Sequence, residues 1–198
     1  MRARSQNGFS LVEMLVSMTV LMLALGGLTS LLIQNSKINK AQRMAAETQA
    51  NARNTLSMVV QKLRSAGWDP RNTGGFPAVT TDADLTDNVS EIEIFADLNE
   101  DTDTDDADEQ IMIRHLGASN SVVWRLSSDP SAAFDVVSAN ITNDADGNGT
   151  PEPMFVPNAN PPTLITVTVT ARSPAPDPTT RRFIRYTVSS DVVLRKSL

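Results

Sequence analysis

The longest apolar stretch of the chain lies close to its start. Residues 9–33 carry one charged side chain, Glu13, and follow a short basic segment, residues 1–8, that ends in Gly8. At about 1.5 Å of rise per residue, a helix over this stretch measures about 37 Å, whereas the hydrocarbon core of a bilayer is about 30 Å thick. The pattern therefore predicts a membrane-spanning helix with some tilt.

The helical pattern continues after residue 33 but changes character. Apolar and small side chains recur at alternating steps of three and four residues, which places them on one stripe of a helix, and most positions between them are polar. The stripe comprises Ile38, Ala41, Ala45, Thr48, Ala52, Leu56, Val59, Leu63 and Ala66. Gly67, followed by Pro70, is typical of a helix end. We therefore expect one long helix whose second half, residues 34–67, is amphipathic and packs on another surface.

Two partners fit that stripe. A coiled-coil dimer uses similar spacing. The other partner is the rest of the chain, residues 68–198, which would form a globular head. We favour the head because the stripe is rich in Ala and because the head is rich in β-forming residues that need covering.

The head has the pattern of an antiparallel β structure. Short runs of β-branched and aromatic residues alternate with turn residues, and prolines between residues 157 and 178 exclude long helices there. The predicted strands cover 91–95, 110–114, 122–126 and 164–171, a strand with Arg182, Ile184, Tyr186 and Val188 on one face, and a closing run at 192–194. The expected fold class is α+β, with a long N-terminal helix packed on an antiparallel β-sheet head.

Composition narrows the range of functions. The chain has 17 Lys and Arg against 23 Asp and Glu, a formal net charge of −6, and no cysteine. Nucleic acid is a disfavoured partner, because DNA binding draws much of its affinity from cationic contacts to phosphate, and the compact basic cluster of Arg181, Arg182 and Arg185 divides between the two faces of a strand. The single histidine, His115, has no nucleophile-elbow motif beside it. We therefore predict no enzyme and interpret His115 as a surface or partly buried strand residue.

The segment Gly8-Phe-Ser-Leu-Val-Glu13 resembles the processing site of type IV prepilins and pseudopilins. The resemblance implies that a prepilin peptidase cleaves after Gly8 and methylates the new amino terminus at Phe9, so that the apolar helix stays on the mature protein. It also implies that Glu13 pairs with the free amine of a neighbouring subunit during assembly. From the residues alone, a second interpretation of Glu13 stays open, because an acid near a helix start lies near the membrane interface and interacts favourably with the helix dipole.

Further segments resemble the PilW/PulJ group of minor pilins. They are the helix-end residues 51–53 and 63–68, the strand-hairpin-strand segment 95–111 and the terminal run 192–195. The resemblance implies a non-enzymatic minor pilin that primes assembly of a type IV pilus and sits at or near its tip. The implied partners are the prepilin peptidase, the inner-membrane assembly platform, other minor pilins and the major pilin.

Two alternatives to this function remain open. A J-type minor pseudopilin of type II secretion resembles the chain in the same regions, and a tip-exposed calcium-dependent adhesin would use the acidic loops to contact a surface. The absence of cysteine removes the disulfide-closed loop seen in many major pilins, which favours a minor pilin or a pseudopilin. The expected location is a single-pass stage in the inner membrane, followed by an extracellular or periplasmic filament.

Two acidic loops of the head have the spacing of calcium ligands. The first places oxygen side chains at positions 1, 3, 5, 7, 9 and 12 of an EF-like loop, the pattern that wraps one Ca²⁺ ion; these are Asp97, Asn99, Asp101, Asp103, Asp105 and Asp108. It departs from the pattern because Thr102 takes the place of the turn glycine and Asp108 replaces the bidentate Glu, although Glu109 is adjacent.

The second loop matches the pattern in its first half. Its candidate ligands are Asp144, Asp146, Asn148 and Glu152. Gly149 occupies the turn position, but Phe155 falls where the last ligand should be. We expect low-affinity Ca²⁺ sites at most and no required cofactor. The alternative for both loops is a solvated acidic hairpin tip.

Overall fold

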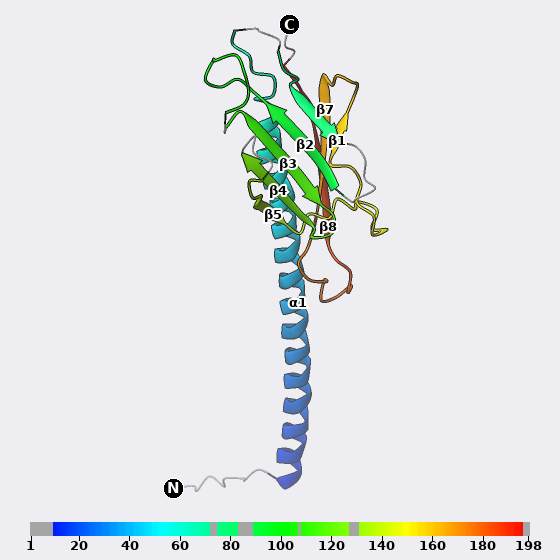
Figure 1. Cartoon of the computed structure of the whole chain (residues 1–198). Helices are drawn as coiled ribbons and strands as arrows, with labels where there is room; N and C mark the ends of the chain where they lie inside the picture. The colour runs from blue at the N-terminus through cyan, green and yellow to red at the C-terminus, as the bar shows by residue number, and fades with distance from the viewer. Residues whose placement is uncertain (1–9, 72–74, 83–88, 107, 127–130, 196–198) are drawn as a thin grey trace.

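A computed structural model describes residues 10–71, 75–82, 89–106, 108–126 and 131–195. Its dominant element is a single helix, α1 (Leu11–Leu63), of 53 residues, which at about 1.5 Å per residue is about 80 Å long. The head packs against only the C-terminal half of this helix, and the N-terminal half extends away from it as a bare rod (Figure 1). The prediction of one continuous helix with two different halves is confirmed.

The helix ends through a tightened turn. After Leu63, the amides of Ser65, Ala66 and Trp68 each donate to a carbonyl three residues back. Gly67 closes the turn with a φ of +70°, a conformation that glycine adopts without the penalty of a side chain. Its amide donates to Phe95 O at 2.8 Å. The predicted glycine stop is therefore confirmed, although the α-helix itself ends four residues earlier.

The head contains two antiparallel sheets rather than the single sheet that we expected. The five-stranded sheet has the order β1-β2-β3-β4-β5, and the three-stranded sheet has the order β6-β7-β8. The strands are β1 (Val79–Asp82), β2 (Val89–Phe95), β3 (Gln110–Leu116), β4 (Ser121–Leu126), β5 (Asp135–Ala139), β6 (Phe155–Pro157), β7 (Leu164–Arg172) and β8 (Arg185–Val193). The pattern missed β1, β5 and β6, and the last two predicted runs form one strand, β8.

The core is shared by the helix and both sheets. The strands alternate between buried and partly exposed positions, so that Ile92 pairs with Ile113 and Ile94 with Ile111 on the buried face of the larger sheet. The helix contacts mainly β7 and β8, and β5 to a smaller extent. The buried cluster includes Ala52, Val59 and Leu63 of α1, Ile92, Ile94, Ile111, Ile113 and Val122 of the larger sheet, and Phe155, Ile165, Val167, Val169 and Ala171 of the smaller sheet.

The buried stripe of α1 follows the predicted spacing with local shifts. Its fully buried members are Met44, Thr48, Ala52, Thr55, Val59 and Leu63. Met44 and Thr55 were not predicted, and Ile38 is 43% exposed because it lies below the head. The buried threonines satisfy their hydroxyls within the helix: Thr48 donates to Met44 O at 2.7 Å, and Thr55 donates to Asn51 O at 2.9 Å. Since this chain's own head covers the stripe, the stripe is closed to a coiled-coil partner.

Polar contacts fix the helix against the edges of both sheets. Gln49 and Arg53 donate to the Tyr186 hydroxyl of β8, each at 3.2 Å. Asn51 donates to Ala139 O of β5 at 2.8 Å and accepts from Ser138 Oγ at 2.9 Å. These bonds set the rotation of the helix about its own axis, which apolar packing alone specifies less strictly.

Replacing Gly67 by Ala tests how tightly the helix end is held. A Cβ at this position would lie 2.8 Å from Arg195 O and 2.9 Å from Ala78 Cβ, at a φ of +70°. We expect Gly67→Ala to lower the free energy of unfolding by about 2–5 kcal/mol, from left-handed backbone strain and overpacking together. Denaturant unfolding of the full chain in detergent micelles measures this.

Gly149→Ala is the matched control. Its φ is +91°, but a Cβ there would meet no atom within 4 Å. We therefore expect only the backbone cost, about 1–2 kcal/mol. Equal losses in the two variants would contradict the close packing of the helix end.

Candidate functional site

Most of the exposed large apolar side chains that the structure describes lie on the N-terminal half of α1. Every large apolar side chain that is described from Leu11 to Ile33 is between 52% and 78% exposed. The helix is long and apolar enough to cross a membrane, with a mean hydropathy of 2.1 over its best 18-residue window and none of that window buried. A surface of this size needs lipid or other helices around it.

The start of the helix has a defined cap and one acid. Ser10 is the N-cap residue, and its Oγ accepts from the Val12 amide at 3.3 Å. Glu13 lies in the first turn, three residues after the cap, where the helix dipole favours a negative charge. The Glu13 side chain is exposed, and within the described residues its carboxylate has no ion pair. The predicted cleavage site at Gly8 and Phe9 lies outside the described residues.

The first acidic loop, residues 97–109, joins β2 to β3 and is built around buried Asp97. Asp97 Oδ1 accepts from Glu100 N at 2.7 Å, and Oδ2 accepts from Thr102 N at 3.2 Å. Asn99 Oδ1 then accepts from Asp101 N, and Asp101 Oδ1 from Asp103 N. Glu100 and Thr102 have φ values of +67° and +85°, so Thr102 adopts the conformation of the turn glycine that it replaces.

The second acidic loop, residues 144–152, repeats this arrangement. Asp144 Oδ1 accepts from Gly147 N at 2.7 Å, and Oδ2 accepts from Gly149 N at 3.2 Å, again three and five residues ahead. Asp146 accepts from Asn148 N, as Asn99 does from Asp101 N. The left-handed residues are Gly147 and Gly149, at the same two positions of the loop. The two loops therefore share one backbone design with different side chains.

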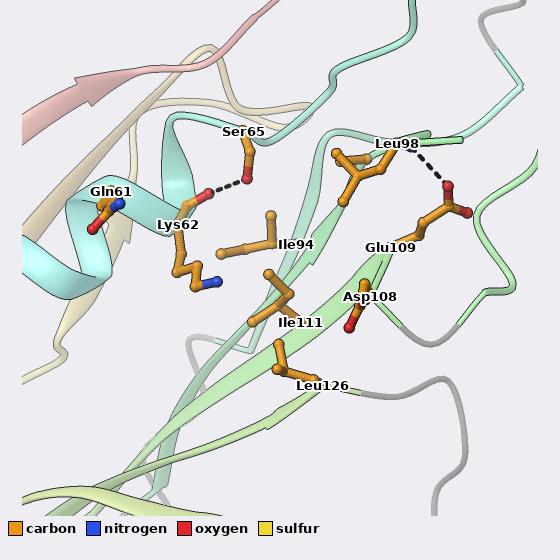
Figure 2. Close-up of a pocket in the computed structure, with 10 residues that line it drawn as sticks. Gln61, Lys62, Ser65, Ile94, Leu98, Asp108, Glu109, Ile111 and Leu126 are labelled. Atoms are coloured by element: carbon orange, nitrogen blue, oxygen red, sulfur yellow. Dashed lines mark hydrogen bonds between the residues drawn. The ribbon is translucent and has the colours of Figure 1, made fainter. Parts of the chain in front are cut away.

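A glutamate closes each loop from its C-terminal side. Glu109 Oε1 accepts from the amides of Leu98 and Asn99, at 2.7 and 3.1 Å. Glu152 Oε2 accepts from Ala145 N at 2.9 Å. Figure 2 shows Glu109 reaching to the backbone of Leu98, while Asp108 leaves the chain in a different direction. The spacing of an EF-like loop predicts Asp108 and not Glu109 as the last ligand, although the two residues are adjacent.

The two loops differ in how their carboxylates are arranged. In the first loop, oxygens of Asp101, Asp103 and Glu109 all lie within 4.8 Å of one another. Asp97 serves as the backbone cap, and Asn99 donates to Asp101 Oδ2 and Asp106 Oδ2. Asp105 and Asp108, which were predicted as ligands, are not in this group.

In the second loop, a basic side chain lies against the capping aspartate. Arg185 Nη2 lies 3.5 Å from Asp144 Oδ2. Its guanidinium also packs on Gly147, where a Cβ would meet Arg185 Nη1 at 2.8 Å. Within the described residues, the predicted ligands Asp144, Asp146 and Glu152 form no compact carboxylate group. Arg185 therefore supplies positive charge to this loop.

Crowding and hydrogen bonding change the acidity of the first loop in opposite directions. The Asn99 side chain, which donates to the carboxylate, lowers the pKa of Asp101. The neighbouring carboxylate of Asp103 raises the pKa of Asp105. Holding both charges of that pair in the folded loop therefore costs free energy.

The single histidine of the chain is a buried core residue. His115 is 1% exposed, more deeply buried than we expected, and its Nε2 lies 2.9 Å from Ile141 O. Burial lowers its pKa, so it is a neutral core residue that donates to that carbonyl.

A cavity of about 320 Å³ lies between the end of α1 and the larger sheet (Figure 2). It is lined by Lys62, Ile94, Ile111 and Leu126 together with Asp108 and Glu109. Lys62 also lies over the Trp124 ring at 5.0 Å.

Comparisons with known proteins support one assignment. A family model described as the prokaryotic N-terminal methylation motif matches residues 3–29, which include Gly8, Phe9 and Glu13. Searches of curated proteins and of solved structures found no match. The motif supports a type IV pilin or pseudopilin, and it implies processing by a prepilin peptidase and assembly with other pilins. Together with the apolar helix, it fits a precursor anchored in the inner membrane.

Proposed function

We propose that this chain is a minor pilin that primes assembly of a type IV pilus and takes a place at or near the pilus tip. One observation carries the proposal: the methylation motif leads directly into a helix whose apolar half is bare along its whole length and holds a single acid in its first turn. Among the described residues, the head leaves every large apolar side chain of that half more than half exposed. The bare half is therefore the surface through which the chain meets lipid and then neighbouring helices.

Glu13, the single acid on this surface, can determine how neighbouring helices align along their axes. A carboxylate in the middle of a bilayer costs about 2.5–3.5 kcal/mol on translocon scales. Pairing Glu13 with the positive amino terminus of a neighbouring subunit would offset that cost and fix the axial register between the two helices. A free and methylated Phe9 supplies such an amine after cleavage, which couples processing to assembly.

Features of the head support the proposal that the chain is a minor subunit of the filament. The chain has no cysteine and so lacks the disulfide-closed loop seen in many major pilins, and its helix end and acidic hairpin resemble the PilW/PulJ group. The acidic loop 97–109 lies at the end of the head farthest from the N-terminus (Figure 1). A subunit held by its N-terminal helix presents that end outward. We assign no enzymatic step to the chain.

The mature chain should begin at a methylated Phe9. The physical reason is that cleavage after Gly8 removes the basic segment and leaves the apolar helix intact as the assembly surface. Mass spectrometry of the N-terminal peptide from native membranes measures this. An intact Met1, or cleavage beyond residue 25, would exclude the pilin assignment.

Replacing Glu13 by Ala should leave membrane insertion intact and should strongly reduce incorporation into filaments. Insertion gains from the loss of a charge in lipid, whereas assembly loses the partner of the amino terminus. Fractionation measures insertion, and quantitative blotting of sheared filaments measures incorporation. Glu47→Ala is the matched control, because it removes an exposed acid from the same helix within the head region and should change neither quantity. Normal incorporation of Glu13→Ala would remove the role proposed for this acid.

Deleting the gene should sharply reduce the number of surface filaments, and the tagged protein should be found at low copy number and at filament ends by immunogold labelling. A priming subunit acts at initiation, so that few copies control many filaments. Filaments that persist while secretion of exoproteins fails would identify the J-type pseudopilin alternative instead. Labelling along the whole filament would identify a major subunit.

A further inference from the structure

We propose that the 97–109 loop is a Ca²⁺ site in which Asp101, Asp103 and Glu109 supply the carboxylate ligands. This inference uses only residues of the head and does not depend on the pilin assignment. It revises the ligand set that spacing alone predicts by including Glu109 and by giving Asp97 a structural role.

The arrangement of Glu109 is the first reason. Its side chain is 2% exposed, and its Oε1 holds two backbone amides of the loop. The other oxygen, Oε2, is buried and has no hydrogen-bond partner among the residues that the structure describes. A buried acceptor without a partner is costly, and most costly when it belongs to a charged group. The chain therefore leaves one carboxylate oxygen buried beside two other carboxylates.

The surroundings of Glu109 are the second reason. One oxygen of Asp101 and one of Asp103 lie within 4.8 Å of an oxygen of Glu109. Three negative groups so close together repel one another unless a cation or a proton lies among them. Each of the two aspartates also uses an oxygen to accept from an amide two residues ahead, so the loop backbone holds both side chains in place.

The second loop provides an internal comparison. It has the same cap, the same two left-handed positions and a closing glutamate, but Arg185 lies against Asp144 there. A guanidinium thus compensates the negative charge of that loop. In the first loop we assign the compensation of negative charge to a metal ion among Asp101, Asp103 and Glu109.

The chemistry of the ligands selects the ion. All three are hard carboxylate oxygens on a loop without nitrogen or sulfur ligands, which suits Ca²⁺ and Mg²⁺ rather than a transition metal. Ca²⁺ accepts irregular coordination by six to eight oxygens, whereas Mg²⁺ demands near-octahedral geometry. Two of the three carboxylates are exposed, so water completes the coordination. We therefore expect Ca²⁺ with a Kd on the order of 10⁻⁴ to 10⁻³ M.

The test is a set of melting curves of the full chain in detergent micelles, in chelator, in Ca²⁺ and in Mg²⁺. With about 1 mM free Ca²⁺ we expect the melting temperature of the unchanged protein to rise by a few degrees above its value in chelator. Mg²⁺ at the same concentration should produce a smaller rise. Calorimetric titration should give about one Ca²⁺ per chain in the stated affinity range.

Three variants locate the ion. Glu109→Gln keeps the acceptor for Leu98 and Asn99 and places amide donors beside the aspartates, so it should raise the melting temperature in chelator and abolish the Ca²⁺ response. Asp101→Asn combined with Asp103→Asn keeps both amide acceptors and should also abolish the response. Asp146→Asn, in the second loop, is the matched control and should keep the full response.

The proposal is overturned if the unchanged protein shows no Ca²⁺-specific shift, or if the shift survives in Glu109→Gln. A shift that disappears in Asp146→Asn instead would place the ion in the second loop and would also overturn the proposal.

Discussion

The packing of the second half of α1 against both sheets is the contact on which the rest of the structure depends. Ala52, Val59 and Leu63 are completely buried, and they belong to one cluster with the inner faces of the two sheets. The small side chain of Ala52 lets the helix approach closely, while Val59 and Leu63 fill the space nearer its end. Because one uninterrupted helix carries both this stripe and the bare apolar half, the position of the head is tied mechanically to whatever surrounds the membrane half.

The helix and the central strands were predictable because their patterns are local. Alternation along β2 and β3 places Ile92, Ile94, Ile111 and Ile113 on one face, and a stripe without proline specifies the helix. The division into two sheets was not predictable, because strand pairing depends on contacts distant in sequence. The missed strands are short edges: β1 and β5 lie at the two edges of the larger sheet, and β6 lies at one edge of the smaller sheet. With three to five residues each, they carry too little alternation to be recognised.

The candidate sites were predictable to different degrees. Glu13 stands out in the sequence because it interrupts an apolar run, and the structure adds that it lies in the first turn of α1. The acidic loops stand out by their spacing, but spacing could not say which oxygens converge. Asp97 and Asp144 fit the first ligand position equally well, yet each uses both oxygens to hold backbone amides. Nor could spacing indicate that Arg185, far along the chain, lies against the second loop.

The geometry of the helix end links the first loop to the core. Asp97 N donates to Trp68 O at 2.8 Å, and Gly67 N donates to Phe95 O, so both ends of the helix-terminal turn are bonded to the segment that leads into the loop. Arg195 lies over the Trp68 ring at 4.4 Å and brings the last described residue to the same place. Order in the loop is therefore coupled to order at the end of α1. Glu13 lies about 75 Å away along the helix, a separation at which substitutions act additively. Membrane anchoring by the N-terminal half of α1 and ion-dependent stability of the head are thus physically separate. A substitution at one site leaves the property at the other site unchanged, so that property serves as an internal control.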